Sequence, residues 1–168
     1  MEGSALTSIE KELMLGGGRW IAEFNESFRD FRVRDVKFHL YVRGKLRGKG
    51  LFISRIISYL FTPDYLLGCF VYEAGENVKV SRKQLSRMME AMSERMRKDE
   101  LRFSWLIVLQ DKVHEPLKNF VRRISRPDIG ILLYERTSGE LVHDRNLGIV
   151  MAKRVMNKLI KKWRRRGK

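Results

Sequence analysis

The fold is decided by an almost unbroken apolar run, which reads YLLGCFVY at residues 65–72. The run is short and rich in aromatic side chains, so it is typical of a β-strand that is buried on both faces. Two later runs have the same character, FSWLIVL at residues 103–109 and IGILLYE at residues 129–135. The three runs therefore predict the central strands of one sheet.

Helical patterns separate these strands. Ser81 opens a long helix and stands three residues before Gln84, which is the spacing of a capping box. Pro116 suits the first turn of a shorter helix, and a last helix begins near Leu147. The apolar stripe of the long helix is expected in the core rather than on a methionine-rich binding face, and consists of Leu85, Met88, Met89, Met92 and Met96.

The N-terminal third is less regular. Residues 36–42 alternate between polar and apolar side chains, which predicts a strand lying antiparallel beside the central ones. Residues 7–28 indicate a helix interrupted by glycines, and residues 51–61 indicate another helix. In the first of these, the side chains at helical spacing are Trp20, Ile21, Phe24 and Phe28. We therefore expect an α/β fold, with a central mixed sheet of about four to five strands flanked by helices.

Length and composition fit one packed domain. The chain has 168 residues, 43% of them apolar, which suggests a domain over residues 1–150 and a basic C-terminal helix or tail over residues 151–168. Cys69 is the only cysteine, which excludes an intramolecular disulfide and a cysteine-based metal centre. No apolar run approaches a membrane span, and the N-terminus lacks a signal-peptide pattern, so a reduced, cytoplasmic protein is expected.

Charge is the feature that points to a partner. Lys and Arg number 35 against 20 Asp and Glu, a net charge of +15, which favours nucleic acid or an anionic membrane surface. Residues 32–59 hold eight basic residues against one acidic residue, and residues 153–168 hold nine against none. The residues predicted to contact phosphates are Arg43, Lys45, Arg47, Lys49, Lys161, Lys162, Arg164, Arg165 and Arg166. DNA is favoured over RNA, and contact is expected to be largely independent of base sequence.

Common catalytic motifs are missing from the chain. Residues 44–50 are one residue short of a P-loop and lack its Ser or Thr, and no dinucleotide-binding or nucleophile-elbow motif follows a strand. The three histidines, His39, His114 and His143, are scattered without the i, i+4 pair of a zinc helix. Cys69 lies within an apolar run and is expected to be a buried side chain rather than a nucleophile.

The order of the elements nevertheless resembles that of a known superfamily. LLGCFVYE at residues 66–73 looks like a strand that ends in a catalytic Glu, and a helix with Gln84 follows it. DIGILLYE at residues 128–135, with a hairpin after it, looks like a closing strand. Over residues 33–143 the pattern resembles the restriction-endonuclease-like fold of the PD-(D/E)xK nucleases. In that superfamily two acids hold Mg²⁺, and a Lys two residues after the Glu orients or activates the attacking water.

This chain departs from the superfamily pattern at the lysine. Ala74 and Gly75 follow Glu73, so the motif Lys is missing from its usual place. Lys79 or Lys83, just downstream, is the candidate substitute. The departure favours a scaffold whose catalytic site is degenerate or absent.

Two residues compete for the place of the first acid. Asp64 spells the motif with Pro63, but it stands at the far end of the strand that Glu73 closes, about 30 Å away. Asp35 begins the strand at residues 36–42, and antiparallel pairing would bring it beside Glu73. The resemblance therefore implies a catalytic set of Asp35, Glu73 and Lys79, with Mg²⁺ held by Asp35 and Glu73 if the chain is catalytic.

Three functions follow from these observations. The first is a nucleic-acid-binding protein on a nuclease-like scaffold that lacks a complete catalytic site. The alternatives are an active Mg²⁺-dependent nuclease with a relocated Lys, and a basic amphipathic helix that docks on an anionic membrane or an acidic protein. The sequence leaves open whether the chain forms a homodimer.

Overall fold

The computed structural model describes residues 2–17, 22–46, 66–146 and 148–166. In chain order the helices and strands are α1 (Glu2–Met14), β1 (Ala22–Val33), β2 (Val36–Leu46), β3 (Leu66–Glu73), α3 (Arg82–Lys98), β4 (Leu101–Gln110), α4 (Glu115–Arg123), β5 (Ile129–Glu135), β6 (Leu141–His143) and α5 (Ile149–Arg166). The strands form one six-stranded sheet whose spatial order, β1-β2-β3-β4-β5-β6, repeats their order along the chain. The helix predicted at residues 51–61 lies outside the described residues, as does Leu147.

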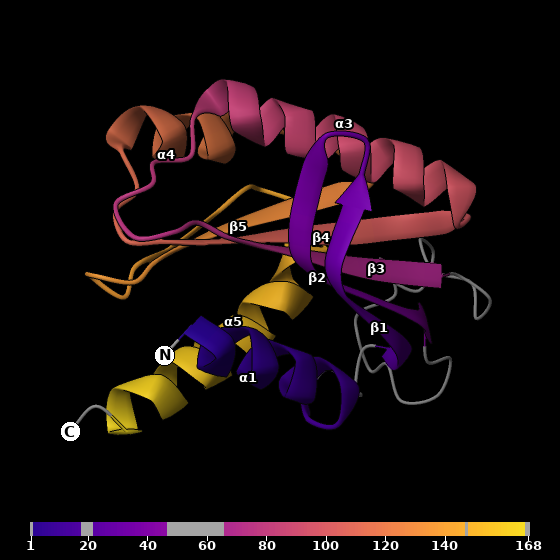
Figure 1. Cartoon of the computed structure of the whole chain (residues 1–168), viewed down its shortest axis with the longest axis horizontal. Coiled ribbons are helices and arrows are strands. Elements are labelled where there is room, and N and C mark those ends of the chain that lie inside the picture. The colour runs from indigo at the N-terminus through magenta and orange to yellow at the C-terminus, as the bar shows by residue number, and fades with distance from the viewer. Residues whose placement is uncertain (1, 18–21, 47–65, 147, 167–168) are drawn as a thin grey trace.

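The sheet is mixed, as the alternation of strands and helices predicts (Figure 1). Strands β1, β2 and β3 are antiparallel neighbours, and β3, β4 and β5 are parallel neighbours. The short strand β6 returns antiparallel to β5. The three apolar runs are the central strands β3, β4 and β5, so the α/β class and the mixed sheet flanked by helices are confirmed.

Strand β1 is the element that the sequence pattern misplaces. Its residues were expected to continue an interrupted helix, because Phe24 and Phe28 stand four residues apart. The register between β1 and β2 shifts between Phe24 and Glu26, where β1 carries an extra residue. This bulge puts Phe24 in the core beneath α1, while Phe28 stacks on Tyr41 on the other side. Two aromatic residues four positions apart therefore belong to a strand here, and the sheet has six strands instead of the predicted four to five.

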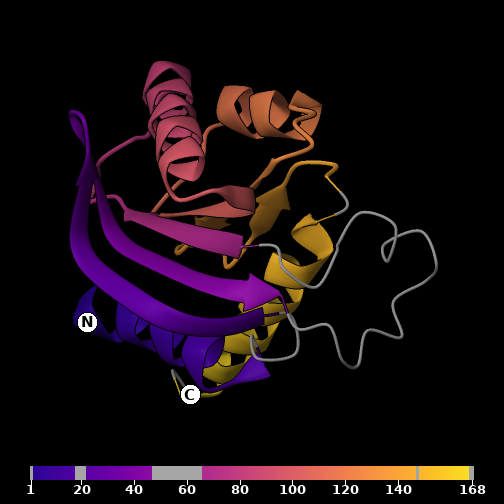
Figure 2. The ribbon, with the colours of Figure 1, turned by 90° about the vertical axis from the view of Figure 1, so that its right-hand side faces the viewer.

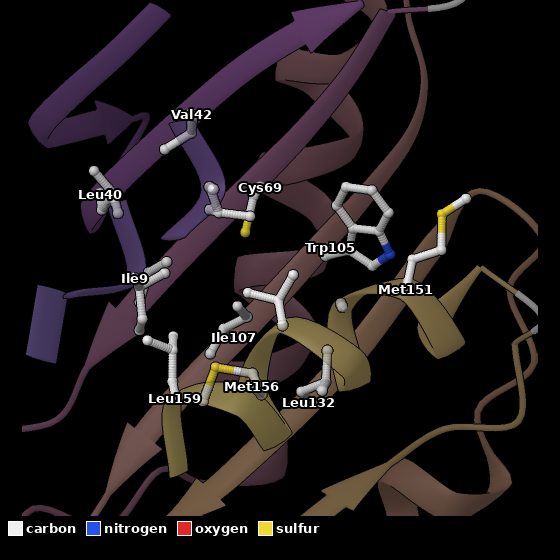
Figure 3. Packing of buried hydrophobic residues seen from close by; sticks show 14 of the residues in the cluster. Ile9, Leu40, Val42, Cys69, Trp105, Ile107, Leu132, Met151, Met156 and Leu159 are labelled. Atoms are coloured by element: carbon white, nitrogen blue, oxygen red, sulfur yellow. The ribbon is translucent and has the colours of Figure 1, made fainter. Parts of the chain in front are cut away.

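Helices cover both faces of the sheet (Figure 2). The crossover helices α3 and α4 lie on one face, and α1 and α5 lie on the other. Beneath α1 and α5 the core centres on Trp105, whose indole N–H donates to the Gly148 carbonyl at 2.9 Å. Figure 3 shows Ile9 of α1 and Leu159 of α5 meeting the strand side chains in this cluster.

The long helix α3 begins as the sequence predicts. Ser81 is its N-cap, and the Ser81 hydroxyl accepts a hydrogen bond from the Gln84 N–H at 3.1 Å. The Gln84 side chain does not return to the cap and instead donates to the Tyr72 hydroxyl at 2.9 Å. The predicted apolar stripe is buried against the sheet and consists of Leu85, Met88, Met89, Met92 and Met96. The stripe therefore serves packing, as expected.

A buried carboxylate orders the turn that precedes α5. Asp144 accepts backbone N–H groups from Ile131 at 3.0 Å and from Asn146 at 3.1 Å. Burial raises the pKa of Asp144, and these hydrogen bonds partly oppose the rise. Beyond this point the apolar face of α5 is buried in the core through Ile149, Met151, Ala152, Val155, Met156, Leu159 and Ile160. Within the described ranges, no helix has the length and apolar character needed to cross a membrane.

Candidate nucleic-acid interface

The exposed face of α5 carries a straight row of cations. Arg154, Lys158, Lys161 and Arg165 follow one another at steps of four, three and four residues, which places them on one side of a helix. All four side chains are exposed. The row extends about 16 Å along the helix axis. We call these four residues the α5 row.

Few acids neutralise this row. Helix α5 contains no Asp or Glu. Lys158 pairs with Glu12 of α1 at 2.7 Å, yet its side chain stays 62% exposed. In the described part of the chain, Arg154, Lys161 and Arg165 have no ion pair. The α5 row is therefore a surface of largely uncompensated positive charge.

The other predicted C-terminal cations flank the row. Lys162 is exposed, and Arg164 donates to the Gly139 carbonyl at 3.2 Å. The side chain of Arg166 and all of Lys168 lie outside the described residues. The structure thus places Lys161, Lys162, Arg164 and Arg165 together at the C-terminal end of α5.

The cations of the β1–β2 hairpin have different surroundings. Arg43 pairs with Glu26 across the hairpin, and it lies 3.4 Å from the carboxylate of Asp99 at the end of α3. Burial lowers the pKa of Arg43, but its hydrogen bond to Glu26 and the charge of Asp99 outweigh that effect and raise it. Lys37 pairs with Asp30 at 2.7 Å in the same hairpin. These cations are held by acids of the protein itself.

The two basic segments do not converge in the described structure. Arg43 points to the α3 side of the sheet, and alternation along β2 places Lys45 on that side too. Helix α5 covers the opposite face. Lys45 is exposed and without an ion pair among the described residues, while Arg47 and Lys49 lie outside them. No single groove therefore joins Arg43 and Lys45 to the α5 row.

The two acids predicted to share Mg²⁺ point to different places. The predicted antiparallel pairing of β2 and β3 is present, with Leu40 opposite Val71. Asp35 lies in the turn before β2, is exposed, and lines a cleft together with Tyr72. Glu73 is the next residue after Tyr72 and so projects from the other face of β3. The structure therefore does not bring the carboxylates of Asp35 and Glu73 together.

Glu73 instead belongs to an ion-pair cluster at the carboxyl ends of the parallel strands. Arg136, just beyond β5, donates to the Glu73 carboxylate at 3.0 Å, to Asp111 at 2.9 Å and to the Ala74 carbonyl at 2.7 Å. A hydrogen bond from the Asn77 N–H lowers the pKa of Asp111, and the Arg136 charge lowers it further. The Glu73 side chain is only 7% exposed. A guanidinium thus holds the carboxylate that was expected to bind a metal.

The remaining predicted residue, Lys79, is exposed in the loop between β3 and α3. It is not among the residues that line the cleft. Arg136 was not predicted as part of this region. Its position after a parallel strand, beside the strand-end acids Glu73 and Asp111, is the signal that could have identified it.

Comparison of the chain with protein-family models, curated proteins and solved structures gives no match, and so assigns it to no family.

Proposed function

We propose that this chain binds nucleic acid through the phosphate backbone, with the α5 row as the contact surface. The observation that carries the proposal is that Arg154, Lys161 and Arg165 form no ion pair with an acid in the described structure. Helix α5 buries its apolar face in the core and presents an acid-free row of Arg and Lys on the other side. Phosphate contacts of this kind position a protein on nucleic acid without reading bases.

The dimensions of the α5 row suit a phosphate backbone. Duplex DNA carries one charge per about 1.7 Å of axis, so a row of about 16 Å lies against many phosphates. Each Lys or Arg that neutralises a phosphate releases a condensed counterion. Binding is therefore expected to weaken steeply as salt rises. DNA is the ligand that we favour.

The packing of α5 weighs against membrane docking by this helix. An interfacial helix needs an apolar face to insert between lipid headgroups. The apolar side chains of α5, Met156 and Leu159 among them, are instead buried against the sheet and α1. An anionic membrane would attract α5 only through the exposed cations of the helix, without an apolar face to insert.

The proposed scaffold is a restriction-endonuclease-like one with a degenerate site. Its support is the succession of α1, the antiparallel strands β1 to β3, helix α3 and the parallel strand β4. Support for degeneracy comes from Glu73, which Arg136 holds, and from Ala74 and Gly75 in place of the motif Lys. Mg²⁺-dependent cleavage is the alternative that the same experiment tests.

The test is a titration of the full chain into labelled double-stranded and single-stranded oligonucleotides, with and without Mg²⁺. With three to four phosphate contacts, the logarithm of affinity falls with a slope of about −3 against the logarithm of salt concentration. Affinity then drops roughly fiftyfold or more between about 50 and 200 mM salt. The triple variant Arg154→Gln, Lys161→Gln and Arg165→Gln is expected to bind about a hundredfold more weakly and to lose most of the slope.

A matched control removes the same charge elsewhere. Arg97→Gln, Lys98→Gln and Lys112→Gln also replace three exposed cations that have no ion pair in the described structure. This control is expected to retain wild-type affinity within about threefold. Equal losses in both triple variants, or binding indifferent to salt, overturn the α5 row as the interface. Shortening of the oligonucleotide only when Mg²⁺ is present, abolished by Glu73→Ala, favours the nuclease alternative.

A further inference from the structure

A cleft of about 590 Å³ opens between the tip of the β1–β2 hairpin and the first turns of α3. Asp35, Lys37 and His39 line it from the hairpin side, and Lys83 and Arg87 line it from α3. Tyr72 of β3 also lines it. The hairpin tip is fixed to α3 by an ion pair between Arg34 and Glu94, farther along the helix. The residues that line the cleft belong to the hairpin, to β3 and to α3, so it lies on the face of the sheet that α3 covers.

Positive charge gathers on the α3 wall of this cleft. Lys83 and Arg87 stand one helical turn apart on the same side of α3, about 6 Å along its axis. Both are exposed, and among the described residues neither has an ion pair. The first turn of α3 contains no acid, so the positive end of the helix adds to their field. Lys37 is already paired with Asp30, and Asp35 is the one carboxylate among the described residues that line the cleft.

The inner wall of the cleft is built from rings held in place. The Tyr72 hydroxyl accepts a hydrogen bond from the Gln84 amide at 2.9 Å, which ties β3 to α3. The His39 ring meets the Tyr72 ring edge-on, with centroids 5.4 Å apart. His39 Nδ1 accepts the Glu73 N–H at 3.0 Å, so the proton of the neutral imidazole is on Nε2. The rings are therefore oriented before any ligand arrives.

We propose that this cleft binds a nucleotide through a terminal phosphate. The phosphate lies between Lys83 and Arg87 at the start of α3, and the nucleoside lies against Tyr72 and His39. A volume of 590 Å³ equals that of about twenty waters, far more than a bare phosphate fills. Clefts of this size commonly hold ligands with tens of atoms. The choice of a nucleotide rests on the proposed function, whereas the need for a phosphate rests on the two cations.

The test measures binding of a nucleoside 5′-monophosphate, the unphosphorylated nucleoside and inorganic phosphate to the full chain by calorimetry. We expect the monophosphate to bind at least tenfold more tightly than either fragment. The double variant Lys83→Gln and Arg87→Gln is expected to bind the monophosphate at least tenfold more weakly. Its matched control, Arg97→Gln and Lys98→Gln, removes the same charge from the other end of α3 and is expected to stay within twofold.

Two further variants separate this site from the α5 row. The triple α5 variant is expected to keep the monophosphate affinity while it loses oligonucleotide binding. Asp35→Asn is expected to raise the monophosphate affinity by about two- to fivefold, because it removes a like charge from the cleft. Its failure to do so counts against a phosphate in this cleft.

Oligonucleotides with and without a 5′-phosphate distinguish the source of the nucleotide. A preference for the phosphorylated strand that disappears in the Lys83→Gln, Arg87→Gln variant identifies the end of a nucleic acid as the ligand. Binding of the monophosphate without such a preference identifies a free nucleotide.

Equal binding of nucleoside and monophosphate overturns the proposal. No binding of the monophosphate at millimolar concentration, or equal loss in the Arg97→Gln, Lys98→Gln control, overturns it too. If oligonucleotide binding survives in that case, the proposed function stands without the cleft. If the chain binds the monophosphate but no oligonucleotide, the cleft stands as a phosphate site and the proposed function is wrong.

Discussion

Two cations of the β1–β2 hairpin and three cations of α5 are the same residue types in opposite situations. Arg43 and Lys37 each pair with an acid of the hairpin. In the described structure, Arg154, Lys161 and Arg165 pair with none. Arg43 and Lys37 are therefore part of what holds the fold together, whereas these three α5 cations are the ones on which the proposed function rests.

The difference follows from which segments the topology places side by side. Residues 1–31 hold six acids against three basic residues, and the basic segment at residues 32–59 comes next in the chain. An antiparallel hairpin folds these two segments onto each other, so that Glu26 and Asp30 meet the cations of β2. Helix α5 has α1 as its neighbour, which supplies Glu12 to the row. A block of like charge in a sequence therefore marks a surface only if its structural neighbours are not of opposite sign.

The strongest way to break this contrast is to give the α5 row its own acids. Arg154→Glu and Asn157→Glu together place a Glu four residues before Lys158 and four before Lys161, the favourable order for helical ion pairs. Oligonucleotide affinity is expected to fall by at least a hundredfold. The free energy of unfolding is expected to stay within about 0.5 kcal/mol of wild type, because both positions are exposed. Binding titrations and urea unfolding measure the two effects.

The triple variant Arg97→Gln, Lys98→Gln and Lys112→Gln changes the net charge by the same amount and is the reference. If it loses as much oligonucleotide affinity as the Arg154→Glu, Asn157→Glu variant, total charge rather than the α5 row governs binding. If the Arg154→Glu, Asn157→Glu variant keeps wild-type affinity, the α5 row is not the contact surface.

The reverse change, at a paired cation, has a smaller and different effect. Arg43→Gln removes the partner of Glu26 and one of the partners of Asp99. Asp99 keeps Arg95 at 2.7 Å and the Tyr41 hydroxyl at 2.6 Å, so the expected loss is about 1 to 2 kcal/mol of unfolding free energy. Oligonucleotide affinity is expected to change by less than about threefold. An affinity loss like that of the α5 variants contradicts the structural role of Arg43.

The smallest effect concerns an acid on the α5 side whose partners are backbone groups. The pKa of Asp144 is raised by burial, so the folded state keeps a proton that the unfolded chain releases near pH 3.8. The stability from this proton is fully present below pH 3.8 and is lost as pH rises through the raised pKa. Asp144→Asn lacks this contribution. Urea unfolding across the acid range is expected to show the stability of wild type relative to the variant declining as pH rises, and a constant difference contradicts it.

Most of the fold could be predicted because its signals are local. Each buried strand run, the Ser81 cap and the methionine stripe depend on residues close in sequence, and all are confirmed. Strand β1 could not be predicted in this way. Its identity as a strand comes from pairing with β2, and its bulge faces Gly44, where a side chain would meet the Phe24 backbone.

The candidate sites were less predictable because they depend on direction and pairing. The sequence predicts that Asp35 and Glu73 lie on neighbouring strands, but it does not show on which face of the sheet each side chain lies. The sequence identifies the basic blocks, but it does not show that Arg43 forms ion pairs with Glu26 and Asp99. Arg136 is remote in sequence from Glu73, and only the three parallel strand ends bring them together.

The match between strand order and chain order has a consequence for how the protein is made. Each strand of the sheet pairs beside the one synthesised before it, so the sheet can grow at one edge as the chain leaves the ribosome. Helix α1 is made before the strands of the sheet, but its partner α5 is made after them. Until α5 emerges, the apolar face around Trp105 lacks most of its cover and is a surface for aggregation or for a chaperone. The nascent chain therefore completes its core and acquires its cationic row in the same step.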